Sequence, residues 1–229
     1  MSTQTMSTQL FRMLVALSGI LGVAALIISF SINPTPPTGA TTAQIVVWGR
    51  EHENLILAGS WLQAIGSFLE VVFILAIIHI AGATQRLSGW ITAFAAIVIM
   101  AVSLVEVSFY LSAIQGGVNG DLTTLAVSLN LIKAIQHAYV IVPAPTILLG
   151  LGVVILNSHV FPRIFGYLAL ALGVIMGILG FVGTFIPLQQ VIDSVLTVQE
   201  VWFAALAITL AISVRKAANG AETILPARA

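Results

Sequence analysis

Few charged side chains occur inside the long apolar segments of this 229-residue chain, and those few are its most informative residues. They are Glu70, Glu106, Lys133 and Glu200. An ionised side chain at the centre of a membrane-spanning helix costs about 2.5–3.5 kcal/mol on insertion scales. Such residues are therefore expected to gather at an internal polar site. Carboxylates at such a site can bind cations or exchange protons, and a lysine can balance their charge.

Polar residues accompany these charges at helical spacing. Residues at i, i+3, i+4 and i+7 share one face of a helix, and lipid offers a polar face no partner. Four segments should therefore turn their polar faces inward around one cavity in the outer half of the membrane. The four faces are Gln63, Ser67 and Glu70; Ser103, Glu106 and Tyr110; Asn130, Lys133 and His137; and Asp193, Thr197 and Glu200.

This pattern indicates binding or translocation, including proton-coupled translocation, of a small polar or cationic solute. Glu106 and Glu200 would bind charge, and Glu70 would continue the path inward. Lys133 and His137 would counter or relay that charge. The candidate ligand-binding residues are Glu70, Glu106, Tyr110, Asn130, Lys133, His137, Gln199 and Glu200.

Other interpretations of the same residues stay open. Glu106, His137 and Glu200 form a ligand set that a metal-dependent intramembrane enzyme could use, although no spacing motif supports it. A non-catalytic membrane partner or sensor is a third hypothesis. Buried ion pairs could also merely fix the helix register, but one lysine and one histidine cannot neutralise three carboxylates. No resident cofactor is expected, and the sequence identifies no protein partner.

Composition restricts the class of protein. The chain is 59% hydrophobic and 7% charged, with a mean hydropathy of +1.10. Eight Lys and Arg residues balance eight Asp and Glu residues, so there is no basic surface for nucleic acid. The absence of cysteine excludes disulfides and cysteine-ligated metals. The lipid bilayer is the expected surrounding, and residues 1–229 are expected to form a single membrane domain.

The fold class predicted is an all-α polytopic bundle of six transmembrane helices, since about 20 apolar residues cross the hydrocarbon core. A β-barrel would need alternating segments of about ten residues, which are absent. Pro34 should end the first helix, Asp121 should cap the fourth, and Pro143 with Pro145 should kink it. The predicted helices are about 10–32, 54–83, 88–114, 122–156, 164–186 and 191–214, with an outer loop at 33–53.

Basic residues predict the orientation. One group falls on a single side of the bundle and only Arg50 falls opposite, so the rule that positive charge stays inside puts both termini in the cytoplasm. A cleaved signal peptide is the alternative for the first segment, but its apolar run is long and lacks a clear Ala-x-Ala site. The expected location is a bacterial inner membrane, crossed several times. The grouped residues are Arg12, Arg86, Arg163, Arg215, Lys216 and Arg228.

Three stretches resemble a family of bacterial six-helix membrane proteins catalogued only as a domain of unknown function. They are residues 54–59, which open the second helix, residues 161–167, which lead into a glycine-rich helix, and residues 197–204, which include Gln199 and Glu200. Glu106 falls where such proteins often have a glutamate. The family's glutamate early in the second helix is replaced here by Leu62 or Gln63, and Glu70 lies deeper. The resemblance implies a six-helix fold and no activity.

Overall fold

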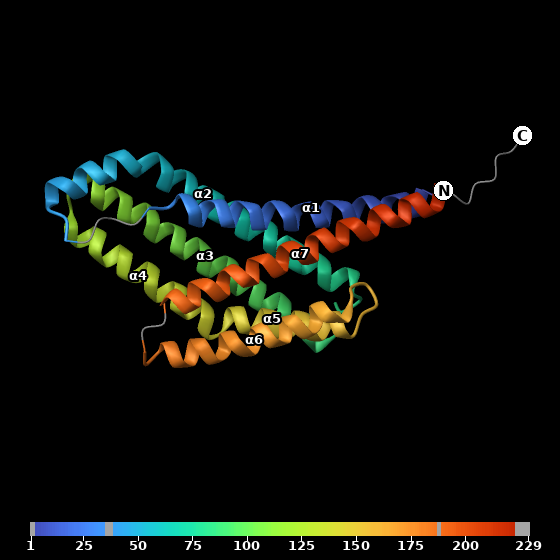
Figure 1. The fold of residues 1–229 in the computed structure, drawn as a ribbon. Coiled ribbons are helices and arrows are strands. Elements are labelled where there is room, and N and C mark those ends of the chain that lie inside the picture. The colour runs from blue at the N-terminus through green and yellow to red at the C-terminus, as the bar shows by residue number, and fades with distance from the viewer. Residues whose placement is uncertain (1–2, 35–38, 187–188, 223–229) are drawn as a thin grey trace, which may run out of the picture.

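The computed structural model describes the backbone of residues 3–34, 39–186 and 189–222, with side chains for residues 8–34, 39–186, 191 and 194–216. Arg228 and the side chain of Asp193, named in the sequence analysis, lie outside these ranges. The described chain is all-helical (Figure 1). Its helices are α1 (Thr3–Ile32), α2 (Thr42–Ile80), α3 (Leu87–Asn119), α4 (Leu122–Ile141), α5 (Pro143–Leu156), α6 (Arg163–Gly183) and α7 (Gln189–Glu222).

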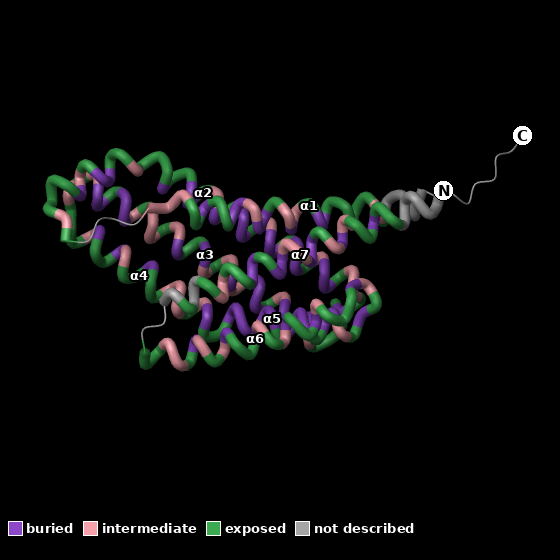
Figure 2. Tube along the Cα trace, in the orientation of Figure 1, coloured by how far each residue is buried: buried purple, intermediate pink, exposed green. Residues whose placement is uncertain are grey.

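Six helical segments are long and apolar enough to cross a membrane, which confirms the predicted six-helix bundle. Each hides one side against its neighbours and leaves apolar side chains exposed on the other (Figure 2). Exposed apolar side chains at this density suit contact with lipid. The segments are Thr8–Ile32, Thr42–Ile80, Leu87–Asn119, Leu122–Leu156, Arg163–Gly183 and Ser194–Lys216.

The start of α2 corrects the predicted loop 33–53. The helix begins at Thr42, because Thr41 and Gln44 form a capping box in which each side chain bonds the other residue's backbone. No proline follows to stop it, so residues 42–53 are helical. Trp48 is only 8% exposed and packs beside Gly117 of α3.

The fourth span is broken in two, as its prolines predict. Val142 leaves the helical conformation at φ −129° and ψ −57°, and Pro143 starts α5. Proline has no N–H, so Pro143 and Pro145 cannot donate to the carbonyl oxygens of Tyr139 and Ile141, the usual acceptors one turn earlier. The hydrogen bond from Thr146 N to Val142 O, 3.1 Å, resumes the regular pattern.

Helix pairs approach closely at glycines, which is how membrane helices gain contact when lipid removes the hydrophobic driving force. A Cβ on Gly66 of α2 would lie 2.9 Å from Leu26 Cγ of α1. A Cβ on Gly180 of α6 would lie 2.7 Å from the carbonyl oxygen of Val140 at the end of α4. Gly166, Gly173 and Gly180 of α6 are buried and therefore pack inside the protein.

The described buried apolar residues form two clusters. The larger one joins all seven helices and includes the fully buried Phe73, Leu148 and Leu206. The smaller one includes Trp48, Ile114 and Leu125 and joins the start of α2, the end of α3 and the start of α4. At 1.5 Å per residue, the 39-residue α2 is about 58 Å long, well beyond the roughly 30 Å hydrocarbon core. The smaller cluster thus belongs to a projection of α2, α3 and α4.

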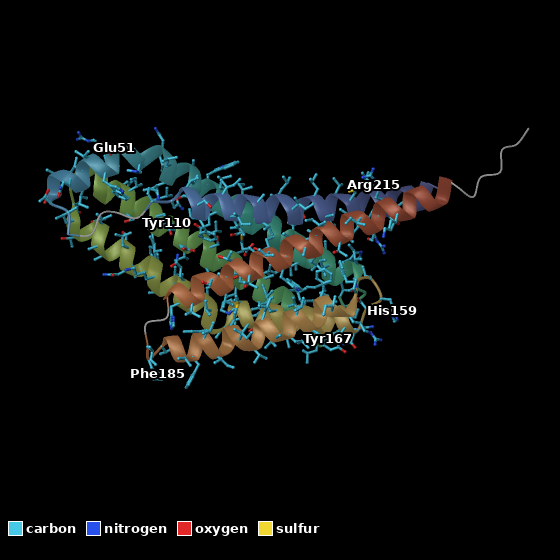
Figure 3. The ribbon with its side chains drawn as sticks, viewed as in Figure 1. Glu51, Tyr110, His159, Tyr167, Phe185 and Arg215 are labelled. Carbon is cyan, nitrogen blue, oxygen red and sulfur yellow. The ribbon has the colours of Figure 1, made fainter. Side chains whose placement is uncertain are left out.

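The start of α1 and the end of α7 lie together at the opposite end from this projection (Figure 1). Arg215 and His159 lie toward that same end, whereas Glu51 and Phe185 lie toward the other (Figure 3). Arg86 Nη1 donates to Asn157 O at 3.4 Å, which joins the α2–α3 and α5–α6 connections. Basic residues therefore collect at the end where the helical termini meet.

Candidate functional site

Glu106 of α3 is held by two amides in a group that we call the outer layer, consisting of Gln63, Glu106 and Gln136. Gln63 Nε2 of α2 donates to Glu106 Oε2 at 2.7 Å, and Gln136 Nε2 of α4 donates to Glu106 Oε1 at 2.7 Å. Gln63 is 2% exposed and Glu106 is 7% exposed. Each carboxyl oxygen thus has its own N–H donor, and three helices are tied together.

A second group lies about 10 Å deeper, because Glu70 follows Gln63 by seven residues on the same helix. We call it the inner layer, consisting of Glu70, Tyr139, Gln199 and Glu200. Gln199 Nε2 of α7 donates to the Tyr139 hydroxyl of α4 at 2.7 Å, and lies 3.5 Å from Glu200 Oε1. Ser67 and Ser103, whose hydroxyls lie 2.7 Å apart, connect the two layers.

The inner layer holds acceptors without donors. Glu70 and Glu200 interact electrostatically, and no hydrogen bond from a described residue reaches the Glu70 carboxyl. Glu200 Oε2 and Gln199 Oε1 are also buried without a partner among the described residues. Buried polar groups are normally hydrogen-bonded, so oxygens in this state can be satisfied by ordered water, a proton or a cation.

The charges of the two layers are unbalanced. Both contain carboxyl groups, three in total, and within residues 8–34, 39–186 and 194–216 no lysine, arginine or histidine bonds to any of them. Lone buried carboxylates are costly. Protons or small cations are the species that can neutralise them here.

Lys133 and Asn130 do not join the site. Both are exposed, so the expected inward face of α4 is wrong by about one residue. The inward face instead carries Ser128, Ile132 and Gln136, which follow one another at spacings of four. Lys133 lies nearly one turn outward of Gln136, toward the projection, where a long cationic side chain can reach water.

His137 and Tyr110 also lie apart from the carboxyl groups. His137 Nε2 lies 3.3 Å from the Thr184 hydroxyl, whose own proton goes to Gly180 O at 3.0 Å. Nε2 is therefore the donor, and the pair joins α4 to the end of α6. Tyr110 packs against the smaller apolar cluster, on the Glu51 side of the molecule (Figure 3).

The metal hypothesis loses its ligand set. Among the described residues, no three His, Asp or Glu side chains come together as a metal site requires. Glu106, His137 and Glu200 are thus not gathered around one point. Of the candidate binding residues, the structure gathers Glu70, Glu106, Gln199 and Glu200.

Two residues of the layers, Gln136 and Tyr139, are not among the candidate residues predicted from the sequence. Both lie on the face of α4 that Ser128 begins, at offsets of eight and eleven residues. That spacing was readable from the sequence. The predicted inward face carries Lys133 and His137, because titratable residues are candidates for a binding site. Such residues also mark the side of a helix that reaches water.

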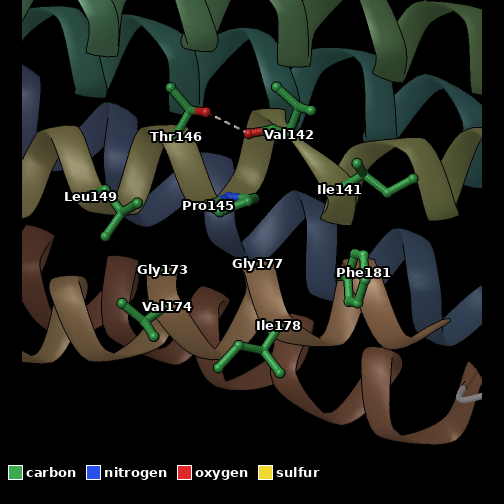
Figure 4. A pocket seen from close by; sticks show the side chains of 10 residues that line it. All are labelled: Ile141, Val142, Pro145, Thr146, Leu149, Gly173, Val174, Gly177, Ile178 and Phe181. Atoms are coloured by element: carbon green, nitrogen blue, oxygen red, sulfur yellow. Dashed lines mark hydrogen bonds between the residues drawn. The ribbon is translucent and has the colours of Figure 1, made fainter. Parts of the chain in front are cut away.

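The groove between α5 and α6 is a separate feature, with a volume of about 500 Å³ (Figure 4). Its lining includes Leu149, Val174 and Ile178, and its one hydroxyl, on Thr146, already donates to Val142 O at 2.6 Å. With no spare polar group among these side chains, it suits hydrocarbon and not a polar solute.

Comparisons were made with protein-family models, with curated proteins and with solved structures. None of them matches this chain. The resemblance to a bacterial six-helix family therefore stays a prediction, and the function has to be argued from the two layers.

Proposed function

We propose that this multi-pass membrane protein binds a small cation, in competition with protons, at the Glu70–Glu200 pair, as one step of coupled translocation. The observation that carries the proposal is the lack of donors in the inner layer: Gln199 Oε1 and Glu200 Oε2 are buried without a partner, and no hydrogen bond from a described residue reaches the Glu70 carboxyl. Carboxylate, amide and phenolic oxygens are ligands that hard cations prefer. The same oxygens accept protons.

Burial limits the size of the ligand. Gln199 is 2% exposed and Glu200 is 8% exposed, so neither presents a surface to a large molecule. A proton or a dehydrated monovalent ion fits such a site, whereas a sugar or amino acid would need the helices to separate. This narrows the solute class that the sequence suggested.

The proposal keeps the predicted orientation. Six spans put both termini on one side, and the basic residues near them favour the cytoplasm. The projection with Glu51 then faces outward, in the inner membrane of a bacterium. The outer layer would lie on the side from which the cation arrives.

The test is proton release on cation addition. Purified protein in a weakly buffered detergent solution with a pH dye receives NaCl or KCl, with choline chloride as the ionic-strength control. We expect Na⁺ or K⁺ to release up to about one proton per chain, because cation and proton share the carboxyl pair.

Two variants test which carboxyl group accounts for the proton release. Glu200→Gln should lower the release at least about tenfold, because it removes a charge that both ligands need. Glu106→Gln should keep most of it, because both Glu106 oxygens already accept a hydrogen bond from an amide. Release by neither ion, or equal release by the parent and Glu200→Gln, contradicts the proposal.

A further inference from the structure

One face of α2 changes character halfway along. Ser60, Gln63, Ser67 and Glu70 follow one another at offsets of three, seven and ten residues, and all are at most 6% exposed. Further along the same face, Phe73, Ile74 and Ile77 are at most 1% exposed and wholly apolar. A buried polar stripe about 15 Å long thus meets an apolar stretch at Glu70.

The outer end of this stripe has unsatisfied polar atoms. Ser60 Oγ and Gln63 Oε1 are buried without a partner among the described residues, as are both amide atoms of Asn33 at the end of α1. The Ser29 hydroxyl donates to Gly59 O at 2.7 Å, which fixes Asn33 beside this part of α2. Buried polar groups of this kind commonly hold ordered water, which bonds two to four of them.

The inner half is closed by packing. A Cβ on Gly19 of α1 would lie 2.8 Å from Phe73 Cδ2 and 2.9 Å from Ala207 Cβ, so α1, α2 and α7 are in tight contact there. Leu206 and Leu210 of α7 are fully buried in the same cluster. An ion crossing this layer would lose its hydration without gaining a polar partner.

From this asymmetry we infer that the Glu70–Glu200 pair is reached from one side only, through a water-lined path along α2 that starts at Asn33 and Ser60. The inference rests on the proposed function, because it names the side from which that site exchanges its proton or cation. The described conformation is then open toward the α1–α2 connection and sealed toward the helical termini. Release to the second side requires α1, α2 and α7 to separate around Phe73.

The absence of native cysteine gives a direct test. Single cysteines at Ser60, Ser67, Ile74 and Ile77 are exposed to Ag⁺, which reacts with thiols and is close to K⁺ in size, on one side of sealed vesicles in nitrate buffer. The protein is then unfolded, and the remaining thiols are counted with a fluorescent maleimide. We expect Ser60→Cys and Ser67→Cys to react from the α1–α2 side at least about tenfold faster than Ile74→Cys and Ile77→Cys, since ions avoid apolar packing.

Further variants keep the outcome clear. Ser103→Cys, on the partner helix of Ser67, should behave as Ser67→Cys and replaces it if that variant fails to elute as a single species. Equal reaction at Ser67→Cys and Ile74→Cys, or reaction of Ser67→Cys only from the side of the termini, overturns the path. The Glu200→Gln background separates the two proposals: the path predicts that silver access persists there, although cation-driven proton release is lost. If the silver test contradicts the path but cation-driven proton release persists, only the path is wrong and the proposed Glu70–Glu200 site stands.

Discussion

The two layers contain similar groups but differ in how their oxygens are satisfied. In the outer layer, Glu106 accepts a 2.7 Å hydrogen bond at each oxygen, from amides on two other helices. In the inner layer, Glu200 has one long contact of 3.5 Å and a free Oε2, and Glu70 lies nearby with no described donor. A saturated carboxylate is suited to hold helices together, whereas an unsaturated pair is suited to take up and release a ligand.

Buried acidic residues in a membrane protein therefore do not all indicate a binding site with equal strength. Both Glu106 and Glu200 are buried and both interrupt apolar helices, so the sequence cannot rank them. Counting donors at each oxygen does rank them.

Removing each glutamate should affect stability very differently. Glu106→Ala leaves the Gln63 amide buried without its acceptor, at about 1–3 kcal/mol, and breaks the hydrogen bond from Gln136, at about 0.5–1.5 kcal/mol. The free energy of unfolding should therefore fall by about 1.5–4.5 kcal/mol. Glu200→Ala leaves no amide orphaned, since Gln199 keeps Tyr139, and it should change the same quantity by less than about 1 kcal/mol. Denaturant titration in one detergent compares them. Equal losses would mean that the layers do not differ in this way.

A glycine pair tests whether the inner layer depends on the contact between α4 and α6. Gly180→Ala puts a methyl group 2.7 Å from Val140 O, next to Tyr139, and should cost about 1–3 kcal/mol by overpacking. Gly177→Ala is the matched control, because its Cβ would lie at an ordinary 3.8 Å from Pro145. Thermal unfolding in detergent measures both. A control as unstable as Gly180→Ala would indicate a general helix effect.

Removing the Tyr139 hydroxyl should sharpen the distinction within the inner layer. Tyr139→Phe deprives Gln199 Nε2 of its 2.7 Å acceptor, so we expect a loss of about 1 kcal/mol in stability. It also removes one oxygen from the proposed cation site, so proton release should need a higher cation concentration. Ser112→Ala, which removes a hydroxyl near Ser128 in the projection, is the control and should leave release unchanged. An unchanged concentration dependence in Tyr139→Phe would exclude Tyr139 from the site.

An exposed carboxyl outside both layers gives the reference for pH effects. The Thr124 hydroxyl, with the backbone amides of Thr124 and Thr123, holds the pKa of Asp121 below its ordinary value of about 3.9. A depressed pKa means that the cap stabilises α4 above that ordinary value and loses this effect as the pH falls through the folded value. The melting temperature of the parent should therefore drop more steeply below about pH 4 than that of Asp121→Asn. If the melting temperatures of the parent and of Asp121→Asn change with pH in parallel, protonation of Asp121 does not affect the stability of the fold.

Much of the fold was predictable because single residue types decide it locally. Six apolar runs gave six spans, Asp121 caps α4, and Pro143 breaks the fourth span. The helical start of α2 was not predicted, because the preceding stretch rich in Pro, Gly and Thr and the charges at residues 50–53 are typical of a loop until the Thr41 cap is recognised. The bonding of the site was not predictable, since hydropathy does not say whether Gln136 or Lys133 points at Glu106. That choice depends on helix rotation, which only packing determines.

The break at Val142 has a mechanical consequence. A continuous helix resists bending because every turn is tied to the next, but around this residue two of those ties are already missing owing to Pro143 and Pro145. The fourth span therefore consists of two rigid helices, α4 and α5, joined by a flexible hinge at Val142. Helix α4 carries Gln136 and Tyr139, one residue in each layer, and α5 packs against α6. A small tilt of α4 would change the hydrogen bonds in both layers at once, without disturbing the packed inner half.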